Sequence, residues 1–326
     1  MHHALPLSII PEEDAKFDEW FYSNYIQLFC SAGDSYDPSD INFQSMFVWD
    51  HKYPHLDLIS VTRDQVRIFS NNLFDFIATS ISNGYYFHTY VDEYYVPLEH
   101  YQTSHVTRDI LIYGIDLEEQ RLHVLGYNST KKVGSEVITF QQFLEGYEAA
   151  PKEIDWAHGI NIYKRKFDKE YKFDIVHVMN ILESYLESKS IHLRGVTNPL
   201  NWYYGLDTIR AISRILSNDE PKPYLSNVPG TILCEHKEIM KNRMIFIRNK
   251  NLVADRGALD KLIDEYDEVV KEYGVLKALV LKYNRKAQQS LITQMVNKLE
   301  AVIELEYTIL SNLLALLRNN IAELSA

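Results

Sequence analysis

The chain has 326 residues, a net charge of −12 and a hydrophobic content of 46%. This length and composition allow one large core or two domains, and they exclude an intrinsically disordered chain. The sequence has no uncharged apolar run of about eighteen residues, so we expect no membrane span. It has no basic region before its first apolar run, so we expect no secretory signal and a cytoplasmic location.

The charge is unevenly distributed along the chain. Residues 1–150 carry 8 Lys and Arg against 22 Asp and Glu, whereas residues 151–326 carry 25 against 23. The acidic half would repel phosphates, which argues against nucleic acid as a partner. It favours a cationic or amine-bearing ligand, with a solvated acidic surface as the alternative interpretation.

Known cofactor motifs are missing from the sequence. The two cysteines, Cys30 and Cys234, make no CxxC pair and cannot build a zinc cluster alone. GxGxxG, GxxxxGK[ST] and HExxH are all absent. We therefore predict no cofactor and no metal, and two reduced thiols.

The N-terminal half mixes helical and β-type patterns. Apolar spacings of three and four residues predict helices at 12–29, 71–83 and 141–150, the second ended by Gly84 and the third by Pro151, with a turn-rich loop at 33–40. Runs rich in aromatic and β-branched residues predict strands at 46–49, 56–61, 85–97, 109–114, 121–127 and 136–140. The last four are joined by short connections, which is typical of an antiparallel meander.

The chain becomes helical after about residue 170. Asp174 is a suitable N-cap for a first helix, and further apolar stripes predict helices at 206–217, 235–248, 258–283 and 289–322. Helices of this length must bury their stripes, so we expect an all-α bundle or long hairpin, and the stripes also suit a homodimer interface. The predicted fold class is α+β, with an α+β domain over 1–165 and a helical domain over 166–326.

The segment 91–147, which contains VDEYYVP and RDILIYG, resembles the N-terminal domain of butirosin biosynthesis protein H and a wider group encoded near non-ribosomal peptide and related natural-product clusters. NYIQLF at 24–29 and EHKEIMKNRM at 235–244 resemble one branch of this group. The resemblance implies a papain-like N-terminal domain. Its active members are cysteine acyltransferases that move an acyl group from a carrier-protein thioester to an amine.

That chemistry needs a cysteine thiolate, a histidine base and an Asn or Asp to orient the histidine. The family's histidine position, six residues before Gly114, holds Arg108, whose guanidinium stays protonated and cannot accept a proton. Asn128 suits the orienting position or makes a turn. In the family, the nucleophile precedes the segment that corresponds to residues 5–10. Only residues 1–4 precede that segment in this sequence, so a nucleophile upstream of Met1 is one alternative.

The remaining candidates for an active enzyme are Cys30, His105 and Asn128. Cys30 is six residues after Asn24, the spacing of an oxyanion side chain and its nucleophile in papain-like enzymes. The sequence places Cys30 at the end of a predicted helix, where the helix dipole disfavours a thiolate, and a buried structural cysteine is the alternative interpretation.

Two further groups are candidates for substrate binding. Tyrosines and carboxylates crowd into 85–101, where they suit an amine or ammonium group, or ordinary sheet packing. On the helix at 235–248, a histidine and an arginine share one face, where they would contact an acidic substrate or make interhelical hydrogen bonds. The predicted substrate-binding residues are Tyr94, Tyr95, Arg108, Asp109, Tyr113, His236 and Arg243. We interpret Glu306, on the last helix, as structural, with Arg243 or Lys282 as its expected partner.

Three functions follow as hypotheses. The first is a papain-like protein with a degenerate triad that binds a small-molecule substrate or carrier-bound intermediate of a natural-product pathway. The second is an active cysteine-type acyl- or aminoacyltransferase that forms an amide from a carrier-protein thioester. The third is a dimeric scaffold or docking module for a partner synthase.

Overall fold

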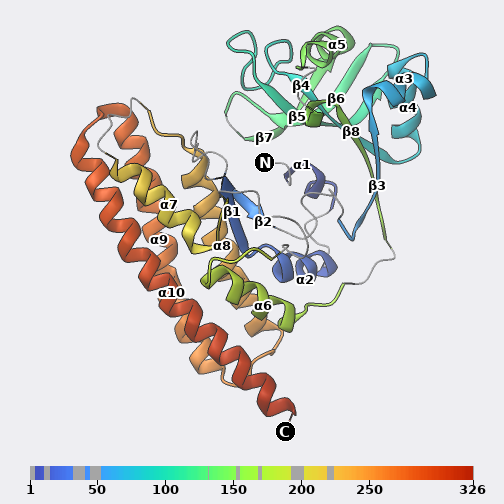
Figure 1. The fold of residues 1–326 in the computed structure, drawn as a ribbon. Helices are drawn as coiled ribbons and strands as arrows, with labels where there is room; N and C mark the ends of the chain where they lie inside the picture. The colour runs from blue at the N-terminus through green and yellow to red at the C-terminus, as the bar shows by residue number, and fades with distance from the viewer. Residues whose placement is uncertain are drawn as a thin grey trace. The chain divides into compact units, whose positions relative to one another are not determined.

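The computed structural model describes residues 4–10, 15–31, 41–44, 53–130, 132–151, 155–167, 171–191, 202–218 and 224–325. The fold is α+β, with an antiparallel sheet in the N-terminal half and a helical C-terminal half (Figure 1). Two compact units make up the chain. Unit 1 comprises Met1–Phe17 and Phe47–Tyr171, and unit 2 comprises Asp18–Met46 and Lys172–Ala326. Unit 2 thus takes in an N-terminal segment that a single boundary at residue 165 would assign to the first domain.

Unit 1 is built on a six-stranded antiparallel sheet of order β3-β8-β4-β5-β6-β7. Its strands are β3 (Leu56–Thr62), β4 (Tyr85–Asp92), β5 (Thr107–Asp116), β6 (Arg121–Tyr127), β7 (Val133–Thr139) and β8 (Gly159–Arg165). The predicted meander is confirmed as β4 to β7. The predicted strand at 85–97 is too long, because β4 ends at Asp92 and residues 94–97 form turns. The predicted strand at 46–49 and the loop at 33–40 lie outside the described residues.

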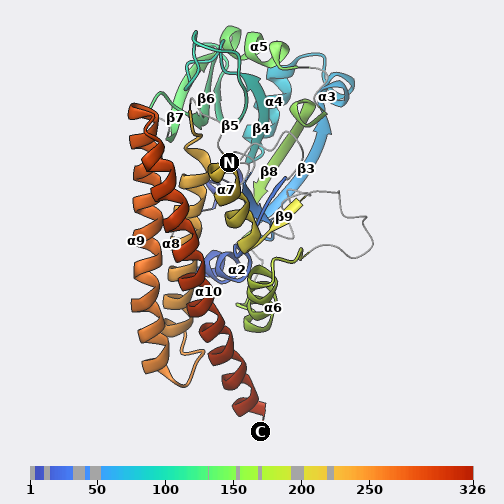
Figure 2. The ribbon, with the colours of Figure 1, turned by 60° about the vertical axis from the view of Figure 1, so that its left-hand side comes forward.

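Helices cover one face of this sheet, as Figure 2 also shows. The helices of unit 1 are α1 (Ala4–Leu7), α3 (Arg63–Phe69), α4 (Leu73–Ser82) and α5 (Phe140–Ala149), with a 3-10 turn at Asp155–His158. Alternate strand residues point to this face and form the core with α4 and α5, among them Phe87, Val91, Ile110, Ile112, Val124, Ile77 and Phe143. Gly84 ends α4 as predicted, with a φ of 78° that favours glycine.

Unit 2 is dominated by long helices. They are α2 (Ala15–Asn24), which begins in unit 1, α6 (Ile175–Leu186), α7 (Leu206–Ser217), α8 (Val228–Asn249), α9 (Arg256–Lys286) and α10 (Gln289–Ser325). Short connections join α8, α9 and α10 into successive hairpins, and α10 also packs on α6 and α7. Figures 1 and 2 both show α9 and α10 side by side. Asp174 caps α6 as predicted, because its Oδ1 accepts from the His177 amide at 2.9 Å.

A small sheet corrects two predictions in unit 2. Its strands are β1 (Gln27–Ser31), β2 (Asn42–Gln44) and β9 (Trp202–Tyr204), in the order β2-β1-β9. The predicted helix at 12–29 therefore ends at Asn24, whose side-chain amide donates to the Trp20 carbonyl at 2.7 Å. The C-terminal half is not wholly α-helical, because it contributes β9.

Gly205 links β9 to α7 in a conformation that needs glycine. Its φ is 53°, and its amide donates to the Leu28 carbonyl at 2.9 Å. A Cβ on this residue would collide with the backbone carbonyl of Tyr185. The close approach of α6 to this turn therefore depends on the missing side chain.

The core of unit 2 contains a buried ion pair. Lys237 on α8 and Glu306 on α10 are both 0% exposed, with Nζ and Oε1 2.8 Å apart. Three tyrosine hydroxyls donate to the same carboxylate, from Tyr185, Tyr266 and Tyr273. The prediction that Glu306 pairs with Arg243 or Lys282 is wrong, but its position on the apolar stripe agrees with a structural role.

Among the described residues, no helix is both long enough and apolar enough to cross a membrane.

Candidate functional site

The connection between β4 and β5 gathers several predicted site residues in unit 1. Asp92 ends β4 and pairs with Thr107 on β5, and the Glu93 amide donates to the Val106 carbonyl at 2.9 Å. Because these pairings close the base of the connection, the side chain of His105 comes back to the end of β4. His105 Nδ1 lies 2.7 Å from Asp92 Oδ2, and its ring stacks on Tyr94 with 4.4 Å between ring centroids.

Arg108 lies on β5 and is held by an ion pair. Its guanidinium donates to Glu99 Oε2 at 2.5 Å, and its side chain is 20% exposed. The Tyr127 ring lies 5.5 Å from the guanidinium carbon, which permits a cation–π contact. Arg108 therefore neutralises one carboxylate of this acidic region.

Asn128 makes a turn in the structure. Its Oδ1 accepts from the Thr130 amide at 3.0 Å, from the Thr130 hydroxyl at 2.6 Å and from the Lys132 amide at 3.3 Å. This is an Asx-type turn at the end of β6, which shapes the hairpin to β7. The described contacts give Asn128 no histidine to orient, whereas Asp92 makes that contact with His105.

Glu93 is a buried acid next to this pair. Its residue is 0% exposed, and neither carboxyl oxygen makes a hydrogen bond of normal geometry with a described residue, although the His100 backbone lies near enough to oppose the effect of burial on its pKa. Burial raises the pKa of Glu93 to about 7, opposed by the Arg108 guanidinium and reinforced by the Glu99 carboxylate. The folded chain thus holds this proton in a range where an exposed glutamate has lost it.

We expect Glu93→Gln to change the pH dependence of stability. Because the folded-state pKa of Glu93 is raised, its contribution to stability is fully present at low pH and is lost as the pH rises through about 7. The variant should gain about 1–2 kcal/mol in unfolding free energy at about pH 8 and far less at about pH 4.5. Urea denaturation at both pH values measures this.

Glu118→Gln is the matched control, because Glu118 is exposed in the β5–β6 turn. It should change stability little at either pH. An equal effect of Glu93→Gln at both pH values would contradict the prediction.

Asp109 belongs to a buried polar cluster on the sheet face opposite α4 and α5. The His88 and Asp109 side chains lie on neighbouring strands, with Nε2 and Oδ2 3.3 Å apart, and both residues are buried. Tyr53, Tyr90 and Tyr163 surround the pair, and burial raises the pKa of all three hydroxyls, with a further contribution from the Asp109 carboxylate. α1 contacts β5, and its Leu5 is fully buried.

The predicted tyrosines differ in position. Tyr94 and Tyr95 follow β4, and their rings lie 4.4 Å and 5.9 Å from the His105 ring. Tyr113 lies further along β5, where it is exposed beside His123 at 6.0 Å. Unit 1 therefore brings Tyr94, Tyr95 and His105 together and leaves Tyr113 apart.

Three predicted residues lie in unit 2. Cys30 is on β1 and 0% exposed, so it does not sit at a helix end. His236 Nε2 donates to the Ile26 carbonyl at 2.7 Å. Arg243 donates to the Tyr22 and Tyr25 carbonyls, both at 2.6 Å. His236 and Arg243 thus hold the backbone where α2 turns into β1, and of their three carbonyl acceptors only that of Tyr22 belongs to a helix. His105 and Asn128 lie in unit 1, whereas Cys30 lies in unit 2.

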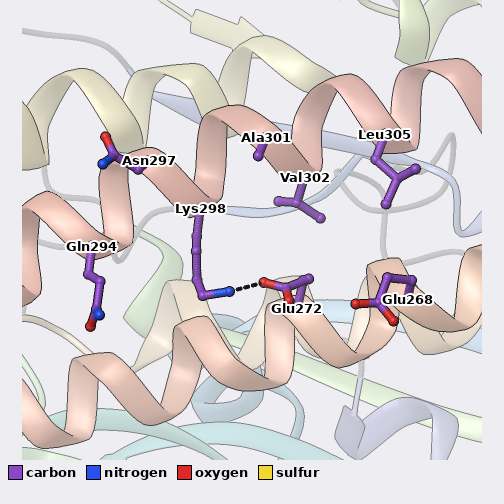
Figure 3. Close-up of a pocket in the computed structure, with 8 residues that line it drawn as sticks. All are labelled: Glu268, Glu272, Gln294, Asn297, Lys298, Ala301, Val302 and Leu305. Carbon is purple, nitrogen blue, oxygen red and sulfur yellow. Dashed lines mark hydrogen bonds and ion pairs between the residues drawn. The ribbon is translucent and has the colours of Figure 1, made fainter.

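A groove lies between α9 and α10 in unit 2 (Figure 3). Its volume is about 390 Å³, and its apolar lining comes from Ala301, Val302 and Leu305. Lys298 crosses it to Glu272, with Nζ and Oε2 2.5 Å apart. The groove is a surface feature of a helical hairpin, and none of the predicted site residues line it.

No group of three or more His, Cys, Asp or Glu side chains is arranged to hold a metal ion in the part of the chain that the structure describes. The candidate site is therefore the β4–β5 connection of unit 1, with the pair His105–Asp92, the pair Arg108–Glu99 and the buried Glu93. No protein-family model and no curated protein matches this sequence.

Proposed function

We propose that this chain is a papain-like protein of a natural-product pathway, of the non-ribosomal peptide type, with a degenerate catalytic triad. It binds a substrate or a carrier-bound intermediate. The observation that carries the proposal is the ion pair of Arg108 with Glu99. At the position where the similar family has its histidine, this chain has a guanidinium that is ion-paired with Glu99.

Two other observations support a degenerate triad. Asn128 is engaged by its own turn. Cys30 is buried on a strand, without the helix N-terminus that would stabilise a thiolate. The antiparallel meander of unit 1 supports the papain-like interpretation.

The charge and the aromatic rings of the β4–β5 connection favour an amine-bearing ligand. Asp92 lies there beside the exposed His105 ring, whereas Glu99 is already paired with Arg108 and Glu93 is fully buried. Tyr94 and Tyr95 add aromatic faces beside these carboxylates. An ammonium group can combine ion pairing with cation–π contacts at such a surface.

The test is binding together with thiol chemistry. The probe is a carrier protein that bears an aminoacyl thioester on its phosphopantetheine arm, titrated calorimetrically into the wild type and into Cys30→Ala. We expect both proteins to bind with the same Kd. We also expect intact-mass spectrometry to detect no acyl adduct on the wild type.

An acyl group on Cys30, or loss of binding in Cys30→Ala, would support the cysteine acyltransferase instead. Failure of the wild type to bind the probe would overturn the proposal. Alkylation provides an independent control, because a buried Cys30 should react with iodoacetamide no faster than Cys234, whose thiol pKa is raised by burial.

A further inference from the structure

The pair His105–Asp92 combines an exposed imidazole with a buried carboxylate. The His105 side chain is 63% exposed, whereas that of Asp92 is 8% exposed. Asp92 is also fixed through its second oxygen, because Oδ1 accepts from the Tyr94 amide at 3.0 Å. One partner is therefore rigidly held by the backbone while the other faces solvent.

This geometry determines which imidazole nitrogen carries the proton. A carboxylate only accepts hydrogen bonds, so His105 Nδ1 donates to Asp92. In the neutral ring the lone pair is then on Nε2, the nitrogen away from Asp92. The Tyr94 ring lies nearly parallel to the imidazole, at an angle of 20°, and limits rotation of the ring.

We propose that His105 and Asp92 form a general-base dyad that activates water or a ligand amine for attack on an acyl group bound at the β4–β5 connection. His105 accepts the proton, and Asp92 is the positioning residue. The choice of acyl ligand rests on the proposed function, but the dyad itself rests on the geometry of unit 1. This dyad needs no nucleophile from the protein, so it works without Cys30.

The step balances with water or an amine as the nucleophile. The nucleophile's oxygen or nitrogen bonds to the acyl carbon, and its proton moves to His105 Nε2. The bond from the acyl carbon to the leaving sulfur or oxygen then breaks, and the leaving group takes its electron pair. His105 returns the proton to a thiolate leaving group or to solvent, and Asp92 stabilises the imidazolium meanwhile.

The test uses p-nitrophenyl acetate, an activated ester that needs no specific binding site, with p-nitrophenolate release followed by absorbance. We expect His105→Asn and Asp92→Asn each to lower the rate by about 10-fold or more, since general-base catalysis typically contributes about 10²–10⁴-fold. His123→Asn is the matched control and should keep the wild-type rate, because His123 lies on β6 away from the pair. Cys30→Ala should also keep it.

The mode of catalysis is read from two further measurements on the wild type. A general base predicts a slower reaction in D₂O and no acetylated protein by intact mass. Acetylated His105, or a rate in His105→Asn equal to that of the wild type, would overturn the dyad. Circular dichroism checks that the variants are folded, and the exposed His105 is the safer of the two positions to change.

The two proposals fail separately. If the carrier-bound thioester binds but ester hydrolysis does not depend on His105, the proposed function stands and the dyad is wrong. If hydrolysis depends on His105 but the carrier probe does not bind, the dyad stands and the proposed function is wrong.

Discussion

Lys237→Met should lower the free energy of unfolding by about 3–5 kcal/mol, because it leaves Glu306 without its cation inside the helical core. The lysine is 0% exposed, and its Nζ also donates to the Tyr185 hydroxyl at 2.9 Å. Three tyrosine hydroxyls alone would then hold a carboxylate that has no access to water. Urea denaturation followed by far-UV circular dichroism measures the loss.

Lys241→Met is the matched control for this prediction. Lys241 is one turn further along α8 and pairs with Asp267 at 2.5 Å, but both side chains are partly exposed. Its replacement should cost about 0–1 kcal/mol. The double variant Lys237→Met with Glu306→Leu should recover part of the loss, since it removes the uncompensated charge. Equal costs at Lys237 and Lys241 would contradict the assignment of a buried pair.

Gly205→Ala should lower the free energy of unfolding by about 2–5 kcal/mol, through backbone strain and steric overlap together. The φ of 53° disfavours a residue with a Cβ, and that Cβ would meet the Tyr185 carbonyl. Relieving the overlap would push α6 away from the β9–α7 turn. The same denaturation experiment detects the loss.

Gly274→Ala is the control for Gly205→Ala. Gly274 lies in the middle of α9 with a normal helical φ, and a Cβ there would have no atom within 4 Å. Alanine should therefore stabilise the helix by about 0.5–1 kcal/mol. A neutral Gly205→Ala would show that the turn can open without cost, against the packing described.

Local patterns predicted the elements whose partners are near in sequence. The alternation in β6 and the caps at Gly84 and Asp174 depend on a few neighbouring residues, and the structure has them as expected. β1 was missed because Leu28 continues the helical spacing of Phe21 and Tyr25. Its strand partner β9 lies more than 170 residues away, so no local signal contains that pairing.

The partners of the site residues were harder to predict than the residues themselves. His105 was a candidate from the sequence, but Asp92 emerges as its partner only when the register Asp92 to Thr107 is known. Glu306 was expected to pair with Arg243 or Lys282, but helix packing places Lys237 of α8 beside it. Pairings of this kind depend on tertiary geometry, which the spacing along one element does not contain.

The discontinuous make-up of unit 2 has a consequence for the order in which the chain is synthesised. The six strands of unit 1 are contiguous in sequence from Leu56 to Arg165, so that sheet can close while translation continues. β1 is translated earlier but obtains its β9 partner, and the His236 and Arg243 hydrogen bonds to the preceding turn, only after later segments emerge. During that interval its buried apolar residues, Leu28 and Phe29, lack their final neighbours, so they stay exposed to water until β9 and α8 have been synthesised.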